Sequence, residues 1–238
     1  MAKTFCFTRS IKLAWLDKVV ELVLEGLTIK EIKTQLDEYL SYEVKDKTNI
    51  GKARNILIKI WADVDESNQG IRDTALLLYK KYPDCAIALH WGMMLLAYSI
   101  FSDLCRLVGR ANELSDVITL KQIQNRLYDD WGESSTLYYS IQKLMSSLKN
   151  IGVLSSEKAG TYKVKIHKIE CPDVVDFLLY IFMKIDGGSY YTFADLSSLT
   201  YMFPFEYTVS KEHLMLNKRF NVTTFDGQFA IALNAPSN

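Results

Sequence analysis

Residues 134–156 of the 238-residue chain are rich in side chains that donate hydrogen bonds. This stretch contains no aspartate or glutamate, although charged residues make up 24% of the chain. Seven of its donor side chains recur at helical spacing: Ser135, Thr136, Tyr139, Gln142, Lys143, Ser146 and Lys149. Phosphates and base edges in the major groove of DNA present mostly acceptors, so a helix with this face suits contact with nucleic acid.

An apolar stripe on the same stretch indicates which element carries these donors. Apolar residues follow one another at steps of four, three, four and three: Leu137, Ile141, Leu144, Leu148 and Ile151. The spacing predicts an amphipathic helix that begins at Ser134 or Ser135 and ends near Asn150, with the donors turned to solvent. No arginine lies on this helix, which counts against base-specific readout, because arginine to guanine is the commonest specific contact.

A lysine-rich hairpin is predicted directly after this helix. Strands are expected at 153–154 and 162–169, joined by a turn that contains Gly160, and Lys158, Lys163 and Lys165 lie on or beside that turn. From 134 to 168 the chain has six lysines against Glu157 alone. With the helix 120–130 in front, the order helix, turn, helix, hairpin is that of a winged helix, whose wing contacts phosphates.

A second basic stretch, residues 45–59, lies near the predicted start of another helix. Lys47, Lys52 and Arg54 are expected on its exposed side, and a helix N-terminus can bind phosphate through free backbone N–H groups. The same pattern also fits an amphipathic helix whose polar face is simply solvated.

The remaining elements indicate a mainly α protein. The first 110 residues show only helical spacing, with helices expected at 11–25, 29–40, 50–61, 71–81 and 84–108, the last closed by Gly109. The charge-free segment 85–101 is too short and too interrupted for a membrane span, and indicates a helix buried on all sides.

The C-terminal third changes to mixed structure. Helices are expected at 174–184 and 192–201, a short helix or extension at 211–216, and strands at 220–224 and 228–233, joined by Asp226-Gly227. The chain therefore divides into a helical bundle (1–112), a winged helix-turn-helix (113–170) and a small α+β unit (171–238), either a second winged-helix-like unit or a β-augmented tail.

Composition and motifs exclude several function classes. The 28 basic residues balance the 28 acidic ones, so any electrostatic footprint is local. The four cysteines and three histidines lack disulfide, redox or metal-ligand spacing, and we expect neither metal nor cofactor. Nucleotide-binding, metalloprotease and hydrolase motifs are absent, and the loop acids Asp63, Asp65 and Glu66 have no strand beside them. We therefore expect a non-enzymatic cytoplasmic protein without a secretory signal or membrane anchor.

Several segments together resemble the BrxA family, accessory proteins of bacteriophage-exclusion (BREX) defence systems. The segments are 52–61 (KARNILIKIW), 88–94 (ALHWGMM), 102–110 (SDLCRLVGR), 118–119, 127–136 (LYDDWGESST), 138–154 and 203–205 (FPF). The resemblance spans about residues 10–230 and implies a soluble, non-enzymatic, helical protein. It further implies a NusB-like bundle followed by winged helices, DNA binding, and operons that encode a methyltransferase, an ATPase and a phosphatase-like protein.

Three hypotheses follow. The first is sequence-tolerant binding of double-stranded DNA in a defence complex, with other BREX proteins as possible partners and the oligomeric state left open. The second is an assembly adaptor that docks on a protein through the Tyr138/Met145 edge of the same helix. The third is RNA binding through the bundle 1–112.

Overall fold

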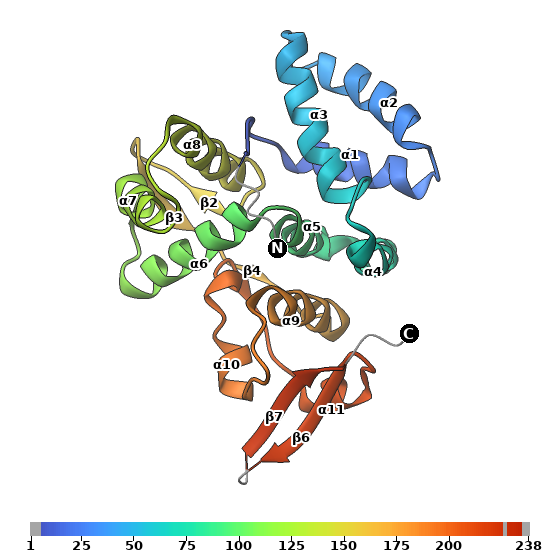
Figure 1. Ribbon diagram of the computed structural model, residues 1–238, viewed down its shortest axis with the longest axis vertical. Helices are drawn as coiled ribbons and strands as arrows, with labels where there is room; N and C mark the ends of the chain where they lie inside the picture. Colours follow the sequence, from blue (N-terminus) through green and yellow to red (C-terminus); the bar gives the residue numbers. More distant parts are fainter. Residues whose placement is uncertain (1–5, 226–227, 235–238) are drawn as a thin grey trace.

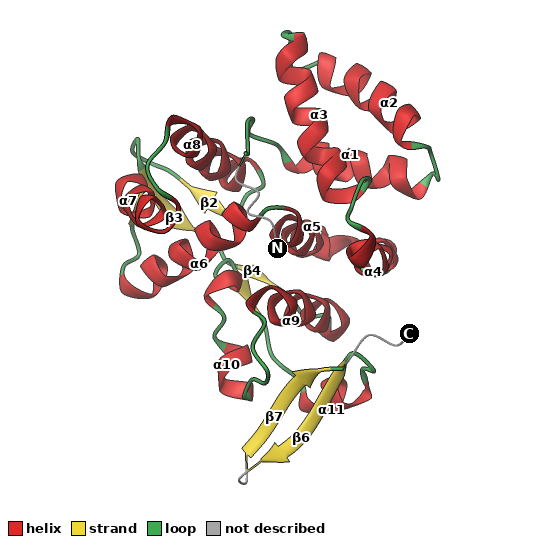
Figure 2. Ribbon diagram, viewed as in Figure 1, coloured by secondary structure: helices red, strands yellow, loops and turns green. Residues whose placement is uncertain are grey.

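The computed structural model describes residues 6–225 and 228–234, and is mainly helical with a few small sheets (Figures 1 and 2). The predicted mainly α fold is confirmed. Buried side chains from Phe7 to Ile231 form one continuous cluster, which includes residues of all three predicted units. The turn residues Asp226 and Gly227 lie outside the described residues.

Local signals place the first three helices, which pack on one another (Figure 1). Gly26, at φ 75°, follows the end of the first helix. The Thr28 side chain and Glu31 form a capping box at the start of the second helix. The third begins three residues earlier than predicted because the Asp46 carboxylate accepts the Asn49 N–H. The helices are α1 (Leu13–Leu24), α2 (Ile29–Ser41) and α3 (Lys47–Trp61).

The apolar segment forms two helices rather than one. The predicted single helix 84–108 is wrong, because the chain turns at Tyr98 (φ −135°, ψ 105°), where the Ser102 hydroxyl donates to the Leu95 carbonyl at 2.9 Å. The second helix also continues beyond Gly109, which was expected to close it. The helices in this region are α4 (Gln69–Lys81), α5 (Ala86–Ala97) and α6 (Ser99–Leu114).

Gly109 serves close packing instead of helix termination. A Cβ atom at this position would lie 2.1 Å from the backbone oxygen of Thr200. Thr200 begins a short 3₁₀ helix, Thr200–Met202, which packs directly on α6. Only a residue without a side chain allows the two backbones to approach this closely.

Helix α5 lies at the centre of the molecule, against α3, α4, α6 and α9 (Pro172–Asp186) (Figure 1). Every side chain from 88 to 96 is buried, as predicted for a helix without a polar face. None of the helices in the described part of the chain has the length and apolarity needed to span a bilayer.

A polar network joins α1, α3, α4 and α5 inside this bundle. The Trp61 indole N–H donates to Nδ1 of His90 at 3.1 Å, so the imidazole proton lies on Nε2. That N–H donates to Oδ1 of Asp17 at 2.9 Å, and the Tyr79 hydroxyl donates to the same oxygen at 2.7 Å. Complete burial lowers the pKa of His90. Burial raises the pKa of Asp17, but the hydrogen bonds from His90 and Tyr79 outweigh it, and the net shift is downward.

We expect the free energy of unfolding to fall between about pH 7 and pH 5 because of His90. In the unfolded chain this ring takes up a proton near pH 6.5, whereas its lowered pKa keeps it neutral in the fold. Below that pH the unfolded state binds more protons, and stability is lost by at most about 1.4 kcal/mol per pH unit. Urea unfolding at pH 7, 6 and 5 checks this. His90→Gln can keep both hydrogen bonds without titrating, so its slope should be shallower; equal slopes would contradict the assignment.

A three-stranded antiparallel sheet and two helices follow α6. The strands β1 (Ile118–Thr119), β2 (Leu154–Ser155) and β3 (Thr161–Val164) are arranged in the order β1-β3-β2. The predicted strand 162–169 is divided, because the chain leaves β2 after Val164 and a second segment pairs in parallel with residues 205–206. The other elements are α7 (Leu120–Trp131), α8 (Ser135–Asn150), β4 (His167–Lys168) and β5 (Phe205–Glu206).

The C-terminal part consists of short helices and a hairpin on α9. The predicted helix 192–201 ends early, at Ser197, and the expected short helix at 211–216 and terminal hairpin are present. The elements are α10 (Phe193–Ser197), α11 (Lys211–Leu216), β6 (Phe220–Phe225) and β7 (Gln228–Leu233).

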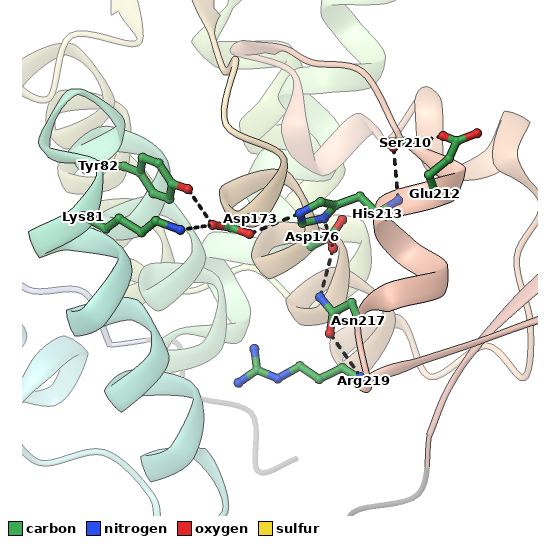
Figure 3. A network of polar contacts seen from close by, with 9 residues as sticks. All are labelled: Lys81, Tyr82, Asp173, Asp176, Ser210, Glu212, His213, Asn217 and Arg219. Atoms are coloured by element: carbon green, nitrogen blue, oxygen red, sulfur yellow. Dashed lines mark hydrogen bonds and ion pairs between the residues drawn. The ribbon is translucent and has the colours of Figure 1, made fainter.

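A second polar network fixes α11 to α9 and to the end of α4 (Figure 3). His213 lies between two carboxylates, with Nε2 3.2 Å from Asp173 and Nδ1 2.8 Å from Asp176. A hydrogen bond from Lys81 lowers the pKa of Asp173, whereas burial raises the pKa of Asp176. Asn217 donates to Asp176 at 2.9 Å. Both ring nitrogens of His213 are engaged within the fold, so the cluster holds helices together rather than presenting a free base.

Candidate nucleic-acid interface

The donor face of α8 is open to solvent, as helical spacing predicted. Four of the seven predicted donors are exposed and three are half-buried: Ser135, Thr136, Tyr139 and Lys149 in the first group, Gln142, Lys143 and Ser146 in the second. The opposite apolar stripe is at most 2% exposed, and α8 packs against α7 and β2. The helix therefore presents its carboxylate-free side outward.

Caps and turns position α8. Gly132 follows α7 with φ 80°, and the Ser134 hydroxyl accepts the Leu137 N–H at 3.2 Å. At the other end of α7, Thr119 and Gln122 form a capping box. Beyond the Ser134 cap, the rings of Tyr138 and Tyr139 pack edge to face with their centroids 5.3 Å apart. The Tyr139 side chain is largely exposed, at 62%.

One flank of α8 is covered by the start of the chain, which periodicity did not predict (Figure 1). The Phe7 N–H donates to the Ser140 hydroxyl at 3.2 Å, and the Ile11 N–H donates to the Ser147 hydroxyl at 3.0 Å. These two serines lie seven residues, or about two helical turns, apart, so both hydroxyls lie on the same side of α8, next to the buried apolar stripe. This spacing is the one signal in the sequence for the contact. Met145 is also fully buried, so the prediction of an exposed Tyr138/Met145 edge is wrong.

The hairpin after α8 carries exposed lysines. Gly160, at φ 75°, completes the turn, and its carbonyl accepts the Leu120 N–H at 2.8 Å, which fixes the hairpin to the start of α7. Lys158, Lys163 and Lys165 are all exposed. Glu157 forms an ion pair with Lys163 at 3.3 Å, so this lysine is partly neutralised.

The structure does not bring the second basic stretch to α8. Helix α3 packs on α1, α2 and α5. Lys47 and Lys52 are exposed, but Arg54 forms an ion pair with Asp37 at 2.5 Å. The Asp46 carboxylate already caps the N-terminus of α3. A phosphate group could bind the N-terminus of α3 only by displacing the Asp46 carboxylate.

No cluster of histidine, cysteine, aspartate or glutamate within residues 6–225 and 228–234 has the geometry to hold a metal ion. No family model matches the chain, and it has no significant match among curated proteins or solved structures.

Proposed function

We propose that this protein binds double-stranded DNA without strong sequence preference, with α8 in the major groove and the β2–β3 hairpin on the phosphate backbone. The observation that carries the proposal is the exposed face of α8, which offers hydroxyl, amide and ammonium donors and no carboxylate. The lack of arginine on this face favours backbone contacts over base readout.

The element order supports a winged-helix assignment. Helix α6 is followed by β1, α7, α8 and the β2–β3 hairpin, and β3 lies between β1 and β2 in the sheet. In this arrangement α8 takes the position of the recognition helix and the hairpin that of the wing.

Unpaired lysines supply the electrostatic part of the proposal. Lys143, Lys149, Lys158 and Lys165 make no ion pair with any residue in the described ranges. Their charges are therefore available to phosphate groups, and binding would release counterions from DNA. On the resemblance to BrxA, we extend the proposal to a non-enzymatic role of this DNA binding in phage defence.

Binding to a 20-base-pair duplex is expected to weaken steeply with salt. If about four to five lysines contact phosphates, the logarithm of the association constant should fall with the logarithm of salt at a slope of about −4. Lys143→Glu/Lys149→Glu should weaken binding by at least about 30-fold, or about 2 kcal/mol. Fluorescence anisotropy between 50 and 300 mM salt measures both effects.

The matched control is Lys30→Glu/Lys33→Glu, which makes the same charge change at two exposed positions of α2. This variant should retain affinity within about threefold, since it changes only long-range attraction. Thermal melting verifies that both variants fold. Equal losses in the two variants, or binding insensitive to salt, would remove α8 from the interface.

A further inference from the structure

A groove between the second half of α6 and α7 carries an unusual share of the arginines. Its volume is about 780 Å³, and we call it the α6–α7 groove. Three of the seven arginines in the chain line it, Arg106, Arg110 and Arg126. No residue of α8 lines it, so it is separate from the proposed DNA-binding face.

The arginines differ in how far they are neutralised. Arg106 lies 3.5 Å from Asp103 and 3.4 Å from Asp130, and its charge is balanced. Arg110 and Arg126 are exposed and form no ion pair with a residue that the structure describes. Asp129 and Asp130 also line the groove, which leaves an excess of one positive charge in its wall.

Exposed apolar side chains lie beside the arginines. Leu114, at the end of α6, is 88% exposed, and Val117, just before β1, is 41% exposed. Both line the groove, together with Leu107 and the buried Ile123. Apolar side chains next to arginines are typical of the centre of protein–protein interfaces rather than of free surface.

We infer that the α6–α7 groove binds an acidic segment of a partner protein that also carries large apolar residues. Carboxylates of such a segment would pair with Arg110 and Arg126, whose planar guanidinium groups can donate two parallel hydrogen bonds to one carboxylate. Its apolar residues would cover Leu114 and Val117. A nucleic acid fits less well, because it has no aliphatic side chain to cover Leu114 and Val117.

Fluorescence anisotropy with the full-length protein and a labelled twelve-residue peptide, three repeats of Glu-Leu-Leu-Glu, tests the inference. We expect saturable binding with a Kd of about 10–100 µM, typical of a short segment in a shallow groove. Arg110→Glu/Arg126→Glu should weaken it about tenfold or more, and Leu114→Ala about threefold. These side chains are exposed, so the variants should fold, which thermal melting verifies.

Two controls separate this site from the DNA-binding face. Lys143→Glu/Lys149→Glu should leave peptide binding unchanged, and Arg110→Glu/Arg126→Glu should leave duplex binding unchanged within about threefold. Three results would overturn the inference: no saturable binding, equal binding of the peptide with glutamine in place of glutamate, or competition by a twelve-nucleotide oligo-dT that depends on Arg110 and Arg126.

Discussion

Gly109→Ala is expected to lower the free energy of unfolding by about 3 kcal/mol, at the upper end of the usual range for overpacking. The added Cβ atom would lie 2.1 Å from the oxygen, 2.8 Å from the carbonyl carbon and 3.0 Å from the Cα atom of Thr200. These are backbone atoms, so no side-chain rotation relieves the clash. Either α6 or the 3₁₀ helix Thr200–Met202 must shift, and the packing between them is lost. Urea unfolding at pH 7 measures the effect.

Gly51→Ala is the matched control, because Gly51 also lies inside a helix. A Cβ atom there would meet only the Arg54 guanidinium, at 3.8 Å. This substitution should stabilise the protein by about 0.5–1 kcal/mol, since alanine favours the helix over glycine. If the two variants unfold at the same urea concentration, the close approach of Thr200 is not a constraint on stability.

Asp17→Ala is expected to lower the free energy of unfolding by about 2 kcal/mol, mainly because the buried His90 N–H loses its acceptor, which costs about 1–3 kcal/mol. The His90 N–H and the Tyr79 hydroxyl both donate to one oxygen of Asp17, and His90 is only 1% exposed, so water cannot readily replace that acceptor. Loss of the carboxylate also removes the side chain through which α1 joins the network of α3, α4 and α5.

Asp17→Asn tests whether the acceptor or the charge matters. Its amide oxygen can accept from the same two donors, so the loss should be about 1 kcal/mol. Chemical unfolding at pH 7 compares the two variants. If Asp17→Asn is as unstable as Asp17→Ala, the negative charge rather than the hydrogen bonds stabilises the bundle.

Features that depend on a few neighbouring residues could be predicted from the sequence. Thr28 with Glu31, and Thr119 as a cap, mark helix starts through contacts three residues apart. The exposed face of α8 follows from helical geometry alone, because the apolar stripe decides which side is buried. These elements form where local preference and packing agree.

Features that depend on distant partners could not be predicted. The break at Tyr98 and the role of Gly109 depend on packing in the folded chain, and Thr200 is 91 residues away from that glycine. In the same way, Arg110 and Arg126 lie on two helices, and only the packing of α6 on α7 puts them in one groove. Helical spacing describes one helix at a time and says nothing of its neighbours.

The contact of the first residues with α8 has a consequence for folding during translation. Phe7 and Ile11 leave the ribosome early, but their acceptors, the hydroxyls of Ser140 and Ser147, are 133 and 136 residues further along. At about 5–20 residues per second, the nascent chain waits roughly 7–27 s for them. During that interval both side chains, fully buried in the finished protein, remain accessible to a chaperone. The segment that contains Phe7 and Ile11 can therefore reach its final position only after α8 has been synthesised.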